Sequence, residues 1–222
     1  MFRPDRKNIL INGAPGSGKT TLVRTIAHNL HDLCPVGFYT AEIRINGIRQ
    51  GFELVSLSGE RRILSHVTIN SPHRVGKYKV DINGFEEFCT ALPLGDTRHP
   101  LIIIDEIGKM ECMSAQFRQM AEQALISDTI VLATIALKGN RFIEGIRQRD
   151  DVELVTLSRQ NRHILPDLII PKIRKMVGET ERDTGSVTLK KKRPDLACVQ
   201  PSLPCHRSTS GHNRLPEPPP CK

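Results

Sequence analysis

The sequence predicts an α/β fold, built on a mainly parallel, twisted sheet with helices on both faces and an inserted β-hairpin. Short apolar runs typical of strands alternate with longer segments whose apolar residues recur at helical spacing. The run 101–104, Leu-Ile-Ile-Ile, is apolar throughout, as in strands that are buried on both faces. The pair Asn46-Gly47 separates two β-rich runs and tolerates positive φ at both positions, which favours a hairpin turn.

The first part of the chain is expected to contain one strand, one helix and the hairpin. A short strand over residues 8–12 precedes a helix whose apolar residues, from Leu22 to Leu33, recur at helical spacing and would lie on the sheet. The hairpin strands are expected over 37–45 and 48–57. The hairpin therefore interrupts the alternation of strands and helices.

Further strands and helices follow the hairpin. A strand is expected over 77–82, and Asn83 with Glu86 three residues later has the pattern of a helix N-cap with its reciprocal partner. That helix would end near Leu92. The remaining expected elements are strands over 101–104, 129–135 and 152–157 and a helix over 114–127.

Composition divides the chain of 222 residues into two parts. Residues 180–222 hold seven of the 15 prolines and no aromatic residue, so this segment cannot bury enough apolar surface to fold. The formal net charge of +8 is split equally, +4 in this segment and +4 in the rest. We predict a P-loop domain over residues 1–178 and a disordered, basic, proline-rich tail over 179–222.

Several classes of protein are excluded by the same composition. The longest uncharged, apolar-rich run, near 129–137, is about half the length that a membrane span requires, so no membrane partner is expected. Six cysteines without a Cys-x-x-Cys pair form neither a disulfide framework nor a zinc site. We expect an intracellular, cytoplasmic protein, with a nuclear location through Lys190-Lys191-Lys192-Arg193 as the alternative.

The strongest motif is a phosphate-binding loop. Residues 13–20 fit G-x-x-x-x-G-K-[ST], the Walker A pattern, between a predicted strand and a predicted helix. Its small residues let backbone N–H groups approach a phosphate closely, and the helix start adds further N–H donors. Lys19 would bridge the terminal phosphates, and Thr20 would offer its hydroxyl oxygen to Mg²⁺. The expected nucleotide-binding residues are Gly13, Ala14, Pro15, Gly16, Ser17, Gly18, Lys19, Thr20 and Thr21.

Two carboxylates follow the apolar run 101–104. Asp105 has the position of a Walker B aspartate and would hold Mg²⁺ together with Thr20. Glu106 comes next and would orient, or take a proton from, the water that attacks the γ-phosphate. The catalytic candidates are therefore Glu106 and Lys19. A solvated strand end is the competing interpretation of the carboxylate pair.

Other candidates carry weaker signals. Thr134, near the end of a predicted strand, is a candidate for binding the γ-phosphate or the attacking water, and a packed strand threonine is the alternative. A loop arginine would stabilise the charge that develops on the transferred phosphoryl group, although no single one stands out. The candidates are Arg61, Arg62, Arg74 and Arg162.

Taken together, several strings resemble the small P-loop nucleoside-triphosphatase family that includes the cancer-related nucleoside triphosphatase. The resemblance covers about residues 7–175 and implies a RecA-like fold, with slow hydrolysis of many nucleoside triphosphates. It assigns residues 13–20 to the phosphates and Asp105 and Glu106 to the metal and the water. Lys109 and Glu111 belong to its most specific string. An ion pair at a helix start is the one mechanism we assign them, and we expect their role to be structural. The strings are 13–22, 37–42, 57–59, 75–78, 104–111, Asn161-Arg162 and Leu165-Pro166.

We therefore expect Mg²⁺-dependent hydrolysis of ATP, GTP and other nucleoside triphosphates. The sequence indicates no base preference, because P-loop contacts address phosphates and no guanine-reading motif stands out. Two alternatives stay open. A P-loop kinase would pass the phosphoryl group to a small molecule or a nucleotide, although Glu106 beside Asp105 favours water as the acceptor. A nucleotide-dependent module could hold nucleic acid through its basic tail, but short basic runs in such tails are more often solvated.

Overall fold

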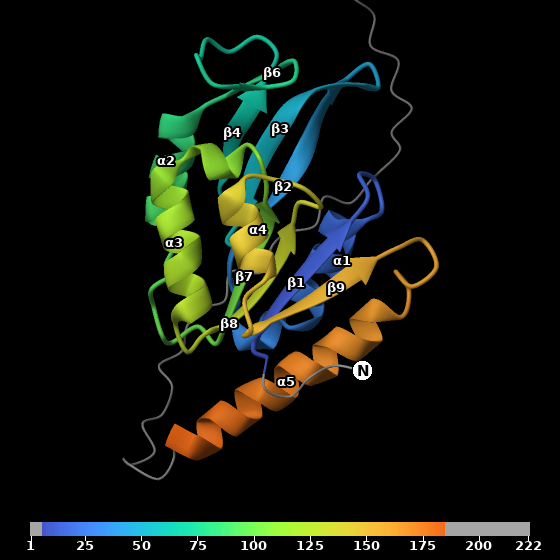
Figure 1. Cartoon of the computed structure of the whole chain (residues 1–222), viewed down its shortest axis with the longest axis vertical. Helices are drawn as coiled ribbons and strands as arrows, with labels where there is room; N and C mark the ends of the chain where they lie inside the picture. The colour runs from blue at the N-terminus through green and yellow to red at the C-terminus, as the bar shows by residue number, and fades with distance from the viewer. Residues whose placement is uncertain (1–5, 185–222) are drawn as a thin grey trace, which may run out of the picture.

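A mixed sheet of nine strands forms the centre of the molecule (Figure 1). The structure is a computed structural model that describes the backbone of residues 6–184 and the side chains of residues 6–178. Five neighbouring strands of the sheet are parallel, so their carboxyl ends share one edge, where ligands bind in open α/β sheets. In spatial order these strands are β9 (Val152–Leu157), β1 (Asn8–Gly13), β8 (Ile130–Ile135), β7 (Leu101–Ile107) and β2 (Val36–Ile45).

The hairpin extends this parallel half into an antiparallel half. Asn46 and Gly47 have φ values of 49° and 75°, so the predicted turn is confirmed. The sheet then continues through four strands, of which the sequence predicted only the first and the third. The second begins with two arginines and the fourth has only two residues, so neither has a clear strand pattern. In spatial order beyond β2 these strands are β3 (Ile48–Ser56), β4 (Arg61–His66), β6 (Tyr78–Val80) and β5 (Arg74–Val75).

Helices cover both faces of the sheet, as predicted. Ile103 of β7 packs with the helices of one face, whereas its neighbours Ile102 and Ile104 pack with those of the other. This alternation explains why the run 101–104 is apolar throughout. One face carries α1 (Lys19–Asn29) and α5 (Leu165–Thr184), and the other carries α2 (Ile82–Ala91), α3 (Ala115–Ile126) and α4 (Arg141–Arg147) (Figure 1).

The predicted cap of α2 is wrong. The N-cap is Asp81, whose side chain accepts a hydrogen bond of 3.0 Å from the Gly84 N–H, and Asn83 lies inside the helix. Glu86 instead accepts a hydrogen bond of 2.6 Å from the Ser114 hydroxyl, which links α2 to the start of α3. Asp81 directly follows β6, so the chain reaches its helical conformation two residues earlier than the capping pattern indicated.

Helices α4 and α5 were not predicted from apolar spacing. The first has seven residues, and the second contains Pro171, which is unfavourable inside a helix. The backbone of α5 continues past Gly178, where we placed the domain boundary, to Thr184. The remainder of the predicted tail, with its basic run at 190–193, lies outside the described residues. None of the described helices combines the length and the apolar character needed to cross a bilayer.

Candidate active site

The phosphate-binding loop joins the end of β1 to the start of α1. Gly16 and Gly18 have φ values of 73° and 102°, a left-handed conformation that glycine adopts without strain. Gly18 is the N-cap of α1 and has no side chain to accept hydrogen bonds from the first N–H groups of the helix. These donors therefore face the loop, at the positive end of the helix dipole, where an anion is favoured.

Lys19 folds back over this loop. Its Nζ donates a hydrogen bond of 3.1 Å to the carbonyl oxygen of Gly13, so the ammonium group lies beside the backbone that would surround a phosphate. Ser17 is buried within the loop, and Thr21 is exposed on the first turn of α1. Lys19 also acts electrostatically on the two carboxylates of β7, since its charge lowers the pKa of both Asp105 and Glu106.

Asp105 is the centre of a buried hydrogen-bond network that joins four elements. Its side chain is 1% exposed, and it accepts a hydrogen bond of 2.5 Å from the Thr134 hydroxyl of β8 and a longer one, 3.5 Å, from the Thr40 N–H of β2. The side chain of Thr20, on α1, hydrogen-bonds the same carboxylate. The structure therefore brings Thr20 and Asp105 together, although 85 positions separate them in the chain.

Burial sets the protonation behaviour of Asp105. Desolvation raises the pKa of the carboxyl, while hydrogen bonds from Thr134, Thr20 and the Thr40 N–H and the charge of Lys19 oppose this change. Thr134 therefore binds the aspartate directly, a role different from the predicted contact with the γ-phosphate. A buried carboxylate held by neutral donors gains most from a cation placed beside it.

The donor set at this position fits Mg²⁺. Thr20 and Asp105 supply a hydroxyl and a carboxylate oxygen, which are the hard ligands that Mg²⁺ prefers, and phosphate oxygens usually complete its shell. Within residues 6–178, no group of three or more His, Cys, Asp or Glu side chains is arranged to hold a metal ion. A cation at Asp105 would therefore depend on the phosphates of a nucleotide for much of its coordination.

Glu106 lies beside this network but faces a different space. The pairing of β7 with β8 is irregular between Ile104 and Ile107, so Asp105 and Glu106 lie at a local break in the ladder. Glu106 is half-buried, and desolvation raises the pKa of its carboxyl, with Lys19 lowering it and Asp105 raising it. Its side chain lines a cavity of about 250 Å³.

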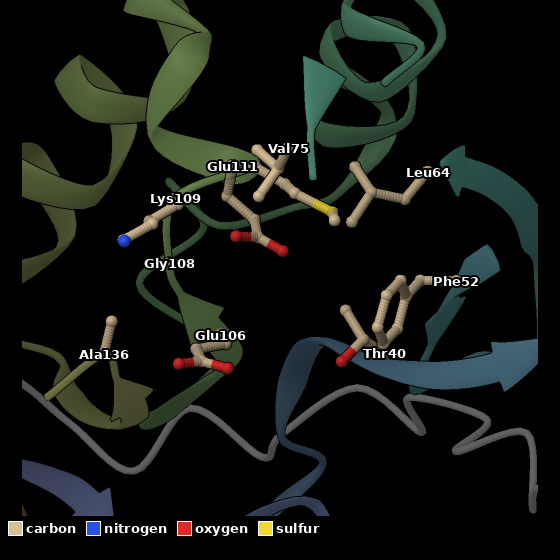
Figure 2. A pocket seen from close by; sticks show the side chains of 10 residues that line it. Thr40, Phe52, Leu64, Val75, Glu106, Gly108, Lys109, Glu111 and Ala136 are labelled. Atoms are coloured by element: carbon tan, nitrogen blue, oxygen red, sulfur yellow. The ribbon is translucent and has the colours of Figure 1, made fainter. Parts of the chain in front are cut away.

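The cavity has one polar side and one apolar side. In Figure 2 the carboxyl groups of Glu106 and Glu111 point into the same space, and Phe52 and Leu64 stand opposite them. Lys109 is exposed, and in Figure 2 its amine points away from Glu111. No ion pair joins these two described residues, so the suggested ion pair at a helix start is wrong. The lining residues are Thr40, Phe52, Leu64, Val75, Glu106, Gly108, Lys109, Met110, Glu111 and Ala136.

Comparison with known proteins agrees with this arrangement. A family model described as NTPase matches residues 8–170, which include the phosphate loop and both carboxylates of β7. The nucleoside-triphosphatase THEP1 of Thermotoga sp. (strain RQ2) is 41% identical over 174 residues, covering 78% of this chain and 99% of that protein.

The chain belongs to this NTPase family.

Two solved structures of the NTPase family have the same architecture. THEP1 from the hyperthermophile Aquifex aeolicus aligns with a TM-score of 0.66 and 34% identity, over 75% of this chain and 98% of that one. A human cancer-related nucleoside triphosphatase aligns with a TM-score of 0.63 and 38% identity, over 73% and 95%. The predicted α/β P-loop fold is confirmed, and the match to the family model ends at residue 170, before the predicted tail.

Three of the four candidate arginines are engaged on the surface of the NTPase domain. Arg61 pairs with Glu53 at 2.5 Å and Arg62 with Glu87 at 2.7 Å, while Arg74 donates to the carbonyl oxygen of Gly76. Arg162 is exposed in the turn after β9, the strand whose last residue, Leu157, is paired with Gly13 of the phosphate loop. Topology therefore places the turn with Arg162, rather than the other three, next to that loop.

Two residues of this candidate site were not predicted as site residues from the sequence. Thr40 contributes only its backbone N–H to Asp105, and a backbone donor leaves no mark in the side-chain pattern. Glu111 was expected to have a structural role only, yet it is 5% exposed and lines the cavity beside Glu106. Membership in the string 104–111 was the only sequence feature that pointed to Glu111, and nothing in the sequence indicated that this residue is buried.

Proposed function

We propose that the chain hydrolyses nucleoside 5′-triphosphates to the diphosphate and phosphate in a Mg²⁺-dependent reaction. The observation that supports this most directly is the convergence of Thr20 and Asp105, with Glu106 beside them and Lys19 acting on both carboxylates. In this proposal, the N–H groups of residues 13–20 and the Lys19 ammonium bind the β- and γ-phosphates. Thr20 and Asp105 hold Mg²⁺, which when bound neutralises charge on the phosphate oxygens.

Glu106 is the proposed catalytic base. It stands one residue beyond the metal-binding Asp105 and faces the cavity, so its carboxylate can accept a hydrogen bond from a water on the open side of the γ-phosphate. Its raised pKa suits this role, because a base whose pKa lies closer to neutrality takes a proton more readily. Thr134 and the Thr40 N–H keep Asp105 in place while Glu106 acts on the water.

Phosphoryl transfer to a small acceptor is the second candidate, and one observation favours it. At about 30 Å³ per molecule, the cavity beside Glu106 would hold about eight waters, far more than one nucleophile needs. An organic hydroxyl group could therefore approach Glu106 in place of water. The carboxylate would then accept the proton of that hydroxyl group.

Phosphate release from ATP, GTP, CTP and UTP, each measured with and without Mg²⁺ and without any acceptor, tests the proposal. Hydrolysis predicts release that needs Mg²⁺, and Lys19→Ala is expected to weaken nucleotide binding. The Arg61→Ala variant is the matched control, since it also removes one positive charge but only from a surface ion pair with Glu53. Absence of release from every triphosphate would reject hydrolysis and leave transfer to an acceptor as the function to examine.

A further inference from the structure

Glu111 is a buried carboxyl that the proposed mechanism does not use. It opens the short 3₁₀ helix η2 (Glu111–Met113), and its side chain is 5% exposed. It forms no ion pair with any described side chain, and the charges that act on it, from Glu106 and Asp105, are both negative. Burial and these two charges raise the pKa of Glu111 to about 8, although the N–H groups of Glu111 and Gly108 hydrogen-bond the carboxyl.

Gly108 brings this carboxyl close to Glu106. A Cβ atom built on Gly108 would lie 2.7 Å from Glu111 Oε2 and 3.5 Å from Glu106 Cδ, so both carboxyl groups flank the same point. In Figure 2 they line the same cavity from different segments, Glu106 from β7 and Glu111 from η2. Two ionised carboxylates that line the same cavity repel each other, so burial beside Glu106 favours the neutral form of Glu111.

We propose that Glu111 is a positioning residue for the hydrolytic step: its neutral carboxyl donates a hydrogen bond that reaches Glu106 through one water, and so holds that carboxylate toward the attacking water. This inference rests on the proposed function, because it gives Glu111 no role except through Glu106. The apolar side of the cavity, formed by Phe52, Leu64 and Val75, supports it, since low polarity strengthens the hydrogen bonds that join the two carboxyls through this water.

Steady-state ATP hydrolysis with Mg²⁺ by the full chain tests the inference with two variants of Glu111. Glu111→Met has a similar length and no donor, and it is expected to lower kcat by about tenfold or more with KM changed less than about twofold. Glu111→Gln keeps a neutral donor at the same place and is expected to stay within about threefold of the wild-type kcat. A merely structural role would instead lower the thermal stability and the nucleotide affinity of Glu111→Met together with its kcat.

Glu86→Gln is the matched control. Glu86 is a carboxylate on the neighbouring helix α2, accepts a hydrogen bond from Ser114 and does not line the cavity. The kcat of the Glu86→Gln variant is therefore expected to equal that of the wild type. Thermal unfolding and the affinity for a fluorescent ATP analogue show whether each variant is folded and binds nucleotide. If Glu111→Met proves unstable, Glu111→Leu, which also lacks a donor, takes its place in the comparison with Glu111→Gln.

The inference is overturned if Glu111→Met turns over at the wild-type rate, or if Glu111→Gln loses as much activity as Glu111→Met. Glu106→Gln, assayed alongside, separates this failure from failure of the proposed function. An inactive Glu106→Gln with a fully active Glu111→Met rejects only the role of Glu111. A fully active Glu106→Gln rejects the proposed base and, with it, the positioning role.

Discussion

At the scale of single residues, the site depends on how neutral hydroxyl and N–H groups hold a buried aspartate. Asp105 is almost fully buried, and its carboxylate binds Thr134, Thr20 and the Thr40 N–H rather than a charged partner. Such an arrangement fixes the orientation of the carboxylate, while the charge of Lys19 compensates its negative charge only in part. A bound divalent cation is the partner that would compensate this charge.

Removing the Thr134 hydroxyl is expected to weaken the response to Mg²⁺. Thr134→Val has nearly the same shape but leaves Asp105 without its 2.5 Å hydrogen bond, so the carboxylate is held less firmly. The Mg²⁺ concentration for half-maximal ATP hydrolysis should rise by about tenfold, the size that the loss of an outer-shell partner typically has. Thr134→Ser, which keeps the hydroxyl, is the control, and an unchanged Mg²⁺ response in Thr134→Val would contradict this role.

Glu111 gives a prediction about stability and pH. Its pKa of about 8 in the folded chain lies above the ordinary value of 4.5, so its stabilising contribution is complete below about pH 4.5 and is lost as the pH rises toward 8. Glu111→Gln removes this dependence. As the pH rises from 5 to 8, the Tm of the wild type should therefore fall relative to the Tm of Glu111→Gln. Thermal unfolding without nucleotide or divalent cation measures it, and a difference independent of pH would contradict it.

At the scale of elements, two turns contain a glycine whose backbone conformation other residues adopt only with strain. Gly18 at the start of α1 and Gly47 in the hairpin both have φ in the left-handed region, and a Cβ at either would meet no atom within 4 Å. The conformation, rather than crowding, therefore requires glycine at both positions. The two turns differ in function, since the first forms part of the phosphate loop and the second joins β2 to β3.

Alanine at these two positions is expected to separate stability from binding. Gly18→Ala and Gly47→Ala should each lower the free energy of unfolding by about 1–2 kcal/mol, because alanine is strained at positive φ. Gly18→Ala should also weaken nucleotide binding, whereas Gly47→Ala should bind as the wild type does. Denaturant unfolding and titration with a fluorescent ATP analogue measure the two effects. Equal affinities of the two variants would argue against a role for the Gly18 conformation in binding phosphate.

The elements that the sequence predicted well are those in which local pattern and tertiary burial agree. The phosphate loop, the run 101–104 and the Asn46-Gly47 turn each carry a local signal that the fold uses directly. Strand β4 and helix α5 carry conflicting signals, because one begins with two arginines and the other contains Pro171. Tertiary packing decides both: Leu64 of β4 and Ile169 of α5 are fully buried.

At the scale of the whole molecule, the two halves of the sheet contribute different parts of the site. The parallel half supplies the phosphate loop and Asp105, and the antiparallel half supplies Phe52, Leu64 and Val75, the apolar side of the cavity. Motif spacing predicted the first set because each motif lies within one local segment. The cavity was not predictable in this way, because it forms only where strands β3, β4 and β5 meet the segment after β7.

The central claim is that Thr20 and Asp105 share a magnesium ion while Glu106 orients the attacking water. Single-turnover hydrolysis of ATP by Glu106→Gln, measured beside its affinity for ATP, tests this claim most directly. We predict that affinity is retained and that the rate of phosphate release falls by about a hundredfold or more, because the amide cannot accept the proton of the water. Phosphate release at the wild-type rate would contradict the account.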